Sequence, residues 1–229
     1  MPVPTEEVYH YPVLLLETLE LLKIQPGKLY LDCTLGGGGH AWHILQQSSP
    51  WGRLIGSDRD KEALEIAREK LASFGARVSL VQANFINLKE VLARLEITQA
   101  DGILFDLGLS RYQLAKEARG FSFKRDGPLD MRMDKGERVT AAQLVNELPL
   151  GELERLIDIY GEERWAARIA ENICRAREKH PLIRTLELAK IVTDAIPARY
   201  RPKRIHPATK TFQALRIAVN RELESLRSA

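Results

Sequence analysis

The sequence has few cysteines and no apolar run long enough to cross a membrane. Its two cysteines, Cys33 and Cys174, lie far apart, and neither belongs to a CxxC pair or to a Cys/His spacing that would hold zinc. We therefore expect two reduced thiols and neither a disulfide framework nor a metal site. The opening residues, Met-Pro-Val-Pro-Thr-Glu-Glu, lack the basic and apolar regions of a secretory signal. Together these absences predict a cytoplasmic protein with no membrane partner.

Charged residues are distributed unevenly along the chain. Residues 1–106 hold ten Lys or Arg against fourteen Asp or Glu, a net charge of −4, whereas residues 107–229 hold 24 against 17, a net charge of +7. A basic half suits a polyanionic partner such as nucleic acid, although many basic faces are only solvated. With 45% hydrophobic and 28% charged residues, the chain as a whole is typical of a folded globular protein.

The stretch with the clearest chemical character runs from Leu29 to His40 and reads Leu-Tyr-Leu-Asp-Cys-Thr-Leu-Gly-Gly-Gly-Gly-His. A short apolar run followed by glycines and a helical pattern predicts a strand, a tight turn and a helix. Glycine lets the backbone take positive φ and come close to a ligand, and the amides that begin the next helix face whatever lies above the turn. The stretch therefore predicts a binding site for a small molecule.

Apolar runs and helical periodicities alternate through the first half of the chain. Strands are expected at 29–31, 54–58, 78–82 and 103–106, and helices at 40–47, 61–74 and 88–95, after a short helix that opens at His10. This alternation is typical of a doubly wound parallel sheet, in which ligands bind at the carboxyl ends of the strands. Four candidate residues fall at those ends: Asp32, Asp58, Phe85 and Asp106.

The second half has a different pattern. Residues 108–134 are rich in glycine, arginine and aromatic residues, and long loops of this kind are usually functional. Thr140 is placed to cap the first of several helices, which are expected at 140–148, 153–160, 162–179, 186–196 and 209–226. This half is expected to be a mostly helical insert with a basic exterior.

Two ligand classes compete for the glycine turn. Gly36-x-Gly38-x-x-Ala41 satisfies the dinucleotide fingerprint, and Asp58 lies twenty residues beyond Gly38, where a ribose-binding acid belongs. Asp32 favours another ligand, because a carboxylate at the mouth of the first strand repels a pyrophosphate and attracts the ammonium of S-adenosylmethionine. The pattern therefore favours a methyl-donor site over a nicotinamide site.

Plainer roles remain open for the same residues. Asp32 would also brace the turn through backbone amides, and Asp58 would also cap the helix that follows it. Phe85 would serve equally as a core residue or as one face of an adenine site. His40 would be an ordinary residue at a helix start, because no second ligand is spaced to support a metal.

Seven blocks in the chain together resemble one family, the bacterial 16S ribosomal RNA cytosine-N4 methyltransferases, known as the RsmH or MraW family. The glycine motif alone would be weak evidence, but the blocks occur in the family's order from about residue 10 to the end of the chain. They are His10–Leu15, Asp32–His40, Asp101–Gly108, Arg119–Phe123, Gly127–Asp134, Tyr160–Arg164 and His206–Asn220.

The resemblance implies a class I (Rossmann-like) methyltransferase sheet of the α/β class, interrupted after strand four by a helical substrate-recognition insert. It implies a methyl-donor-binding domain over 1–107, the insert over 108–205, and a helix over 206–229 that returns to the α/β domain. The implied cofactor is S-adenosylmethionine and the implied partner is 16S ribosomal RNA in the small ribosomal subunit; homodimer formation is left open. The implied methyl-donor contacts are Gly38, Gly39, His40, Asp58, Phe85, Asp106 and Gln113.

The chain departs from the family pattern in two places. The family usually has a second serine after Ser110, where this chain has Arg111. The family also continues beyond the last expected helix, so strand four is expected to be an uncovered edge of the sheet. A non-catalytic donor- or RNA-binding remnant, or a methyltransferase for another substrate, therefore remains an alternative reading.

In the implied reaction, the protein must hold the N4 amine of a cytosine in line with the donor methyl group. Asp106 is the candidate catalytic residue, because an acceptor for the N4 protons would assist attack; a role only in donor binding is the alternative. Residues 119–133 are expected to wrap an unstacked nucleotide. The candidates for phosphate contacts are Arg201, Lys203, Arg204 and Lys210, with a solvated basic face as the alternative.

Overall fold

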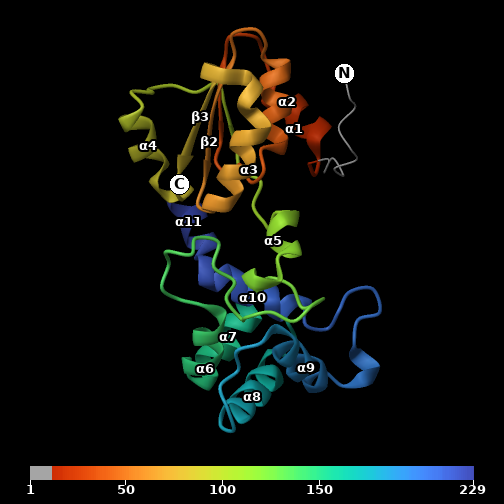
Figure 1. Ribbon diagram of the computed structural model, residues 1–229. Helices are drawn as coiled ribbons and strands as arrows, with labels where there is room; N and C mark the ends of the chain where they lie inside the picture. The colour runs from red at the N-terminus through yellow and green to blue at the C-terminus, as the bar shows by residue number, and fades with distance from the viewer. Residues whose placement is uncertain (1–11) are drawn as a thin grey trace. The chain divides into compact units, whose positions relative to one another are not determined.

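A computed structural model describes residues 12–229 (Figure 1). The chain divides into two compact units between Gly108 and Leu109, and the second unit extends to Arg227. The expected start of a helix at His10 lies outside the described residues, and the helix that is seen there, α1, spans Leu15–Leu22.

The first unit is built on a four-stranded parallel sheet with the order β3-β2-β1-β4. The strands are β1 Leu29–Asp32, β2 Arg53–Asp58, β3 Val78–Gln82 and β4 Gly102–Leu104. The predicted α/β class with a parallel sheet is confirmed. The last strand is shorter than expected: it ends at Leu104, so Asp106 lies beyond the strand rather than at its last position.

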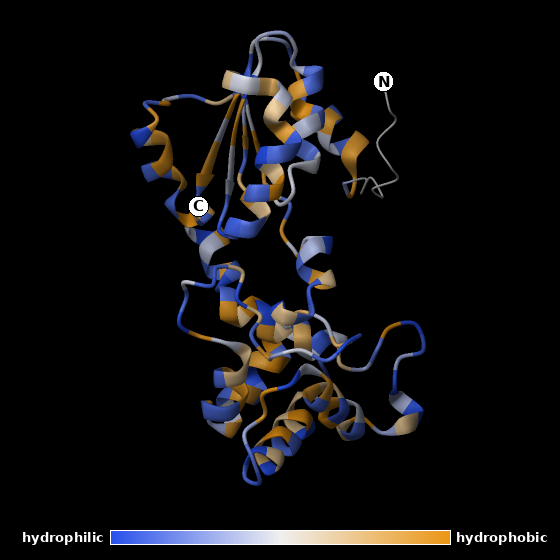
Figure 2. Cartoon of the chain, in the orientation of Figure 1, coloured by the Kyte–Doolittle hydropathy of each residue, from blue (hydrophilic) through white to orange (hydrophobic). Residues whose placement is uncertain are grey.

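Helices cover both faces of the sheet, because successive strand residues point to opposite sides. Tyr30 and Leu54 pack on one face with the inner sides of α2 (Gly39–Gln47) and α3 (Lys61–Leu71). On the other face, Leu31 and Ile55 pack with the side chains of α4 (Leu88–Arg94). Figure 2 shows the apolar character of these strands. The two short turns that flank β3 are η1 (Ala72–Arg77) and η2 (Phe85–Asn87).

Strand β4 lies at one end of the sheet and, among the described strands, pairs with β1 alone. Ile103, at its centre, keeps 47% of its side chain exposed. The predicted uncovered edge at strand four is therefore present in the described part of the chain.

The second unit consists of helices around one apolar core. They are α5 Arg111–Ala115, α6 Ala141–Glu147, α7 Leu150–Gly161, α8 Ala166–Arg177, α9 Thr185–Ala195, α10 Thr209–Asn220 and α11 Glu222–Ser228, with short turns η3 Glu117–Arg119 and η4 Ala198–Tyr200. Helices α7 and α10 pack closely because Gly161 has no side chain: a Cβ there would lie 2.8 Å from the Lys210 carbonyl oxygen. Thr140 caps α6 through a reciprocal pair of hydrogen bonds with Gln143, as predicted for this threonine.

The expectation that residues 119–133 wrap a nucleotide is wrong for several of their side chains, because these are buried. Arg119 is only 2% exposed, and its guanidinium donates to the carbonyls of Arg132 and Met133. Met131 is fully buried in the helical core. These side chains therefore hold the unit together and are not available to wrap a nucleotide. The longer loop expected over 108–134 is also not structureless, because it includes α5 and η3.

Two expectations about helices also differ from the structure. The predicted helix over 209–226 breaks at Arg221, which adopts a left-handed φ of 49°. The break follows Asn220, whose amide binds the carbonyl of Met131 and the amide of Met133 instead of solvent. Helix α10 packs on α7 and α6, so residues 209–220 belong to the helical unit, whereas the sequence placed 206–229 with the α/β domain.

None of the helices in residues 12–229 combines the length and the apolar character that crossing a membrane requires.

Candidate functional site

The glycine turn connects β1 to α2 through two residues with left-handed backbone. Gly36 has φ of 52° and Gly38 has φ of 76°, values that side chains disfavour. Packing at Gly38 is also tight, since a Cβ there would lie 3.3 Å from the end of the Leu71 side chain on α3. The turn therefore brings the first amides of α2 to the carboxyl end of β1, as the sequence predicted.

Asp58, the last residue of β2, holds this turn in place. One carboxylate oxygen accepts from the Gly36 amide at 2.8 Å, and the other accepts from the Asp60 amide at 2.8 Å. Burial raises the pKa of Asp58, and the two amides counteract part of that rise. The alternative role as a helix cap is wrong, because Asp60 caps α3 by accepting from the Glu62 amide. Each oxygen of Asp58 keeps a second lone pair, so a ribose role stays a prediction.

Asp32 is buried at the end of β1 and is 2% exposed. One of its oxygens accepts from the Thr34 amide at 3.2 Å, so the bracing role that the sequence left open is present. Burial raises the pKa of Asp32 to about 7, and the nearby charges of Asp58 and Asp106 act in the same direction against that amide and His40. A buried carboxyl group with this pKa changes charge near neutrality and attracts a cationic ligand.

Asp106 lies two residues beyond β4 and is held through its backbone. Its amide donates to the Thr34 hydroxyl at 2.7 Å, which ties the exit of β4 to the glycine turn. Its side chain is half exposed, and one oxygen lies 3.4 Å from Nε2 of His40. His40 is nearly buried, and its Nδ1 has no hydrogen-bond partner among the described residues. The imidazole therefore meets Asp106 through Nε2, while Nδ1 is enclosed by the protein.

The structure places Phe85 and Gln113 differently from the residues above. Phe85 begins η2 after β3, and its ring meets the edge of Phe105 at 5.6 Å between centroids, on the apolar cluster below α4. Its core role is thus present, and its role beside an adenine stays a prediction. Gln113 belongs to the second unit, where its side chain accepts from the Ser110 amide in a capping box on α5.

Two further residues were missed in the sequence. Thr34 joins two segments 72 residues apart, a contact that no local spacing could indicate. Asp60 was missed although a signal existed, because an aspartate directly before a helical pattern is a typical N-cap. The two cysteines are free, and burial raises the pKa of the Cys33 thiol to about 12, so it stays protonated.

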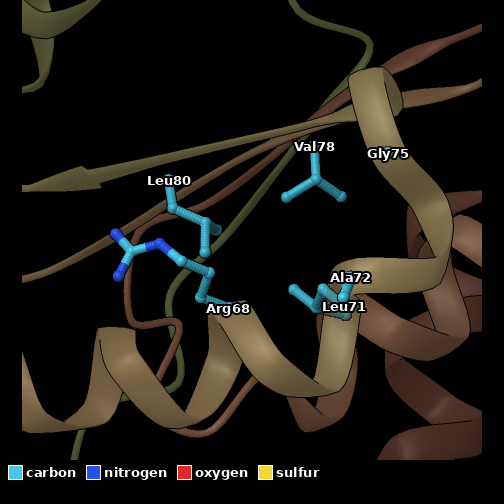
Figure 3. A pocket seen from close by; sticks show the side chains of 6 residues that line it. All are labelled: Arg68, Leu71, Ala72, Gly75, Val78 and Leu80. Atoms are coloured by element: carbon cyan, nitrogen blue, oxygen red, sulfur yellow. The ribbon is translucent and has the colours of Figure 1, made fainter.

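A pocket elsewhere in the first unit does not coincide with these residues. It has a volume of about 210 Å³ and lies between α3 and β3, near the start of the strand rather than its carboxyl end (Figure 3). Its lining is mostly apolar and comprises Arg68, Leu71, Ala72, Gly75, Val78 and Leu80. No predicted site residue lines it, so we place the candidate site at the glycine turn.

The residues at the turn fit a cationic methyl donor. Asp32, Asp58 and Asp106 supply three carboxyl groups, and His40 lies beside the last of them. Within residues 12–229, no group of three or more His, Cys, Asp or Glu side chains is placed to bind a metal ion.

The four candidates for phosphate contacts fall into two pairs in the second unit. Arg201 donates to the Ile196 carbonyl at 3.0 Å, and Lys210 donates to the Glu162 carbonyl at 2.6 Å, so both are committed to the backbone. Lys203 and Arg204 are exposed and have no polar partner in the part of the chain that the structure describes. The second pair is therefore the better placed for an external anion.

Comparison with known proteins identifies the family. The model of the MraW methylase family matches residues 7–229, and the chain belongs to this family of methyltransferases, whose cofactor is S-adenosylmethionine. A protein of Symbiobacterium thermophilum is 54% identical over 218 residues, covering 95% of this chain and 69% of the relative. One of Geobacter sulfurreducens is 55% identical over 217 residues, covering 95% and 70%. Both carry the name "Ribosomal RNA small subunit methyltransferase H".

Among solved structures, TrmN from Thermus thermophilus is 24% identical, with a TM-score of 0.38 over 47% of this chain and 31% of that one. This likeness is too limited to support any argument about the site.

Proposed function

We propose that this member of the MraW methylase family transfers a methyl group from S-adenosylmethionine to the N4 amine of a cytidine in the decoding region of small-subunit ribosomal RNA. The observation that carries the proposal is the cluster of Asp32, Asp58 and Asp106 around a left-handed glycine turn. The names of relatives that are 54–55% identical support ribosomal RNA as the substrate. The choice of cytosine N4 follows from the resemblance of the seven sequence blocks.

The donor would be held at the carboxyl ends of the strands. Gly38, Gly39 and His40 would meet it with the backbone amides at the start of α2, and Asp58 would bind its ribose hydroxyls. Phe85 and Gln113 are further proposed contacts to the methyl donor. S-adenosylmethionine supplies a methyl group on a positively charged sulfur, so it brings its own activation. The task of the protein is then to hold the acceptor amine in line and to exclude water.

Asp106 is proposed to accept a proton from the N4 amine. The lone pair of this amine is delocalised into the cytosine ring, so an acceptor for its N–H protons makes attack easier. The half-exposed carboxylate of Asp106 can reach a substrate, while its backbone is fixed by Thr34. His40, 3.4 Å from the same carboxylate, would orient it. The alternative, in which Asp106 only binds the donor, predicts a loss of donor affinity in place of a loss of turnover.

The second unit is proposed to recognise the RNA. Its residues carry a net charge of +7, as expected for a surface that meets phosphates. A target base must leave its stack to reach a methyl donor, so the unit would hold an accessible, single-stranded region.

A labelling experiment tests the proposal. The protein is incubated with methyl-labelled S-adenosylmethionine and small ribosomal subunits from a strain without this activity, and the RNA is digested to nucleosides. We expect label in N4-methylcytidine, and no label with subunits from a strain that already carries the modification. Label on another base or on protein would contradict the assignment. Donor binding by calorimetry without any transfer would instead favour the reading of a non-catalytic remnant.

A further inference from the structure

The loop between α9 and α10 concentrates positive charge around one exposed aromatic residue. Its sequence from Arg199 to Arg204 is Arg-Tyr-Arg-Pro-Lys-Arg, and the chain has no acidic residue between Asp194 and Glu222. The loop leaves α9 through η4 and returns to the helices at Thr209, the start of α10 (Figure 1). Because no carboxylate in this stretch offsets the four cations, the loop is a local source of positive potential.

An aromatic and arginine cluster stands at the start of this loop. The ring of Tyr200 lies 5.5 Å from the ring of Trp165, with the two planes 38° apart. The guanidinium of Arg164 lies over both rings, 5.0 Å from the Trp165 centroid and 4.8 Å from that of Tyr200. Arg199 adds a second guanidinium 4.6 Å from Tyr200. Two aromatic rings and two planar guanidinium groups are thus close together.

This cluster is anchored on one side and open on the other. Trp165 lies at the start of α8 and packs against the helical core, and its amide donates to the Glu163 carboxylate at 3.0 Å. Tyr200 is 43% exposed, and Arg164 and Arg199 are exposed as well. The core therefore fixes the tryptophan, while the tyrosine and the two guanidiniums face solvent.

The charges of the cluster are not used inside the protein. Among the described residues, neither Arg164 nor Arg199 forms an ion pair, and their guanidiniums interact with the rings alone. Lys203 and Arg204 have no partner there either. Some exposed arginines of the unit, such as Arg125 and Arg184, pair with carboxylates, whereas others, such as Arg138, have no such partner among the described residues. What distinguishes this place is that the unpaired cations lie against aromatic rings and next to further unpaired cations in sequence, which suits a ligand with both flat bases and phosphates.

We propose that this cluster and loop form a binding site for single-stranded RNA, with bases stacking on Tyr200 and on the guanidinium planes of Arg164 and Arg199 and with phosphates meeting Lys203 and Arg204. Aromatic rings and guanidinium planes are the groups on which proteins stack unpaired bases, and adjacent cations follow the backbone. A duplex offers no free base faces, so it would meet only the charges. The site rests on the proposed function in that RNA is taken as the substrate, and it lies wholly within the second unit.

The test uses the full chain and a short fluorescein-labelled single-stranded RNA, with binding followed by anisotropy. Tyr200→Ala should weaken binding at least about fivefold, the lower end of the loss of one base stack, whereas Tyr200→Phe should bind within about twofold of the parent. Trp51→Ala, which removes an exposed aromatic side chain of the first unit, is the matched control and should change nothing.

A second pair of variants separates local charge from total charge. The double change Lys203→Gln and Arg204→Gln should lower the slope of log affinity against log salt by about 1.4, because each lost single-strand phosphate contact contributes about 0.7. The double change Lys89→Gln and Arg94→Gln removes the same charge from exposed positions on α4 and should leave the slope unchanged.

Equal binding by Tyr200→Ala and the parent, or equal loss with the duplex form of the same RNA, would overturn the site. The outcome is separate from that of the labelling experiment. Normal methylation with an unchanged KM for subunits in Tyr200→Ala would remove this site and leave the proposed function in place. RNA binding that depends on Tyr200, without any methyl transfer, would support this site and contradict the proposed function.

Discussion

The two units of this chain use their charged groups in opposite ways. Residues 1–108 carry a net charge of −4 and residues 109–227 a net charge of +7. In the first unit, the buried Asp32 has no cationic partner among residues 12–229 except a neighbouring histidine, so its charge is available to a ligand. In the second unit, the buried Arg119 is satisfied by carbonyls and the buried Glu222 by Arg216, so these charges serve the fold. Unsatisfied buried charge therefore marks a site, and satisfied buried charge marks scaffold.

The largest expected effect comes from removing the charge of Asp106. Asp106→Asn keeps the size and the backbone contact with Thr34 but cannot accept the amine proton. We expect the single-turnover rate of methyl transfer to fall at least about 100-fold, the lower end for general base catalysis. Donor affinity, measured by calorimetry, should change only a few-fold.

The matched control is Glu65→Gln, an exposed carboxyl group on α3 of the same unit, which should retain full turnover. A tenfold or greater loss of donor affinity in Asp106→Asn, with turnover of bound substrate retained, would assign this residue to binding rather than to catalysis. In that case Asp32, Asp58 and Asp106 would all serve in donor binding.

The next effect concerns the buried Asp32 and its dependence on pH. The folded protein holds the pKa of Asp32 at about 7, above the ordinary value of 3.8, so it binds more protons than the unfolded chain between these values. The contribution of Asp32 to stability is therefore greatest below about pH 4 and is lost as the pH rises toward 7. Asp32→Asn removes this loss, and it should stabilise the first unit above pH 7 by at most about 4 kcal/mol.

Thermal unfolding of the full chain at about pH 5 and about pH 8 measures this effect. Donor binding should show the opposite trend. Affinity of the parent for the cationic donor should rise with pH through about 7, as Asp32 ionises, and the affinity of Asp32→Asn should stay flat. A variant that is less stable than the parent at about pH 8 would show that the Thr34 hydrogen bond outweighs the cost of burial.

The same contrast explains what the sequence could and could not predict. The sheet was predictable because each strand is a short apolar run, and β3 was placed to the residue at Val78–Gln82. The acids at the strand ends were found for the same reason. The scaffold of the second unit was not predictable from the sequence. The burial of Arg119 depends on carbonyls thirteen and fourteen residues away, and the break at Arg221 depends on contacts across almost 90 residues. Local sequence patterns do not indicate partners that are this distant along the chain.

A smaller effect is expected from Asn220, whose buried hydrogen bonds belong to the scaffold of the second unit. Asn220 donates to the carbonyls of Met131 and Arg216 and accepts from the Met133 amide, all within the second unit. Asn220→Ala leaves these backbone groups buried without partners and should lower the free energy of unfolding by about 3 kcal/mol. Gln213→Ala, an exposed position on the same helix, should cost less than about 0.5 kcal/mol. Hydrogen exchange of α10 amides measures both, and donor binding by the first unit should not change.

The smallest effect lies at Thr34, where the two kinds of role meet in one side chain. Its hydroxyl accepts from the Asp106 amide at 2.7 Å, so it positions the proposed base without touching the substrate. Thr34→Val keeps the shape but removes the acceptor, and we expect turnover to fall about tenfold with donor affinity and KM for subunits nearly unchanged. Thr34→Ser restores the hydroxyl and should restore turnover to within about twofold. If the valine variant lost stability but kept its rate, or if serine failed to restore the rate, Thr34 would belong with Asn220 as scaffold. His40 would then be the one residue proposed to act through Asp106.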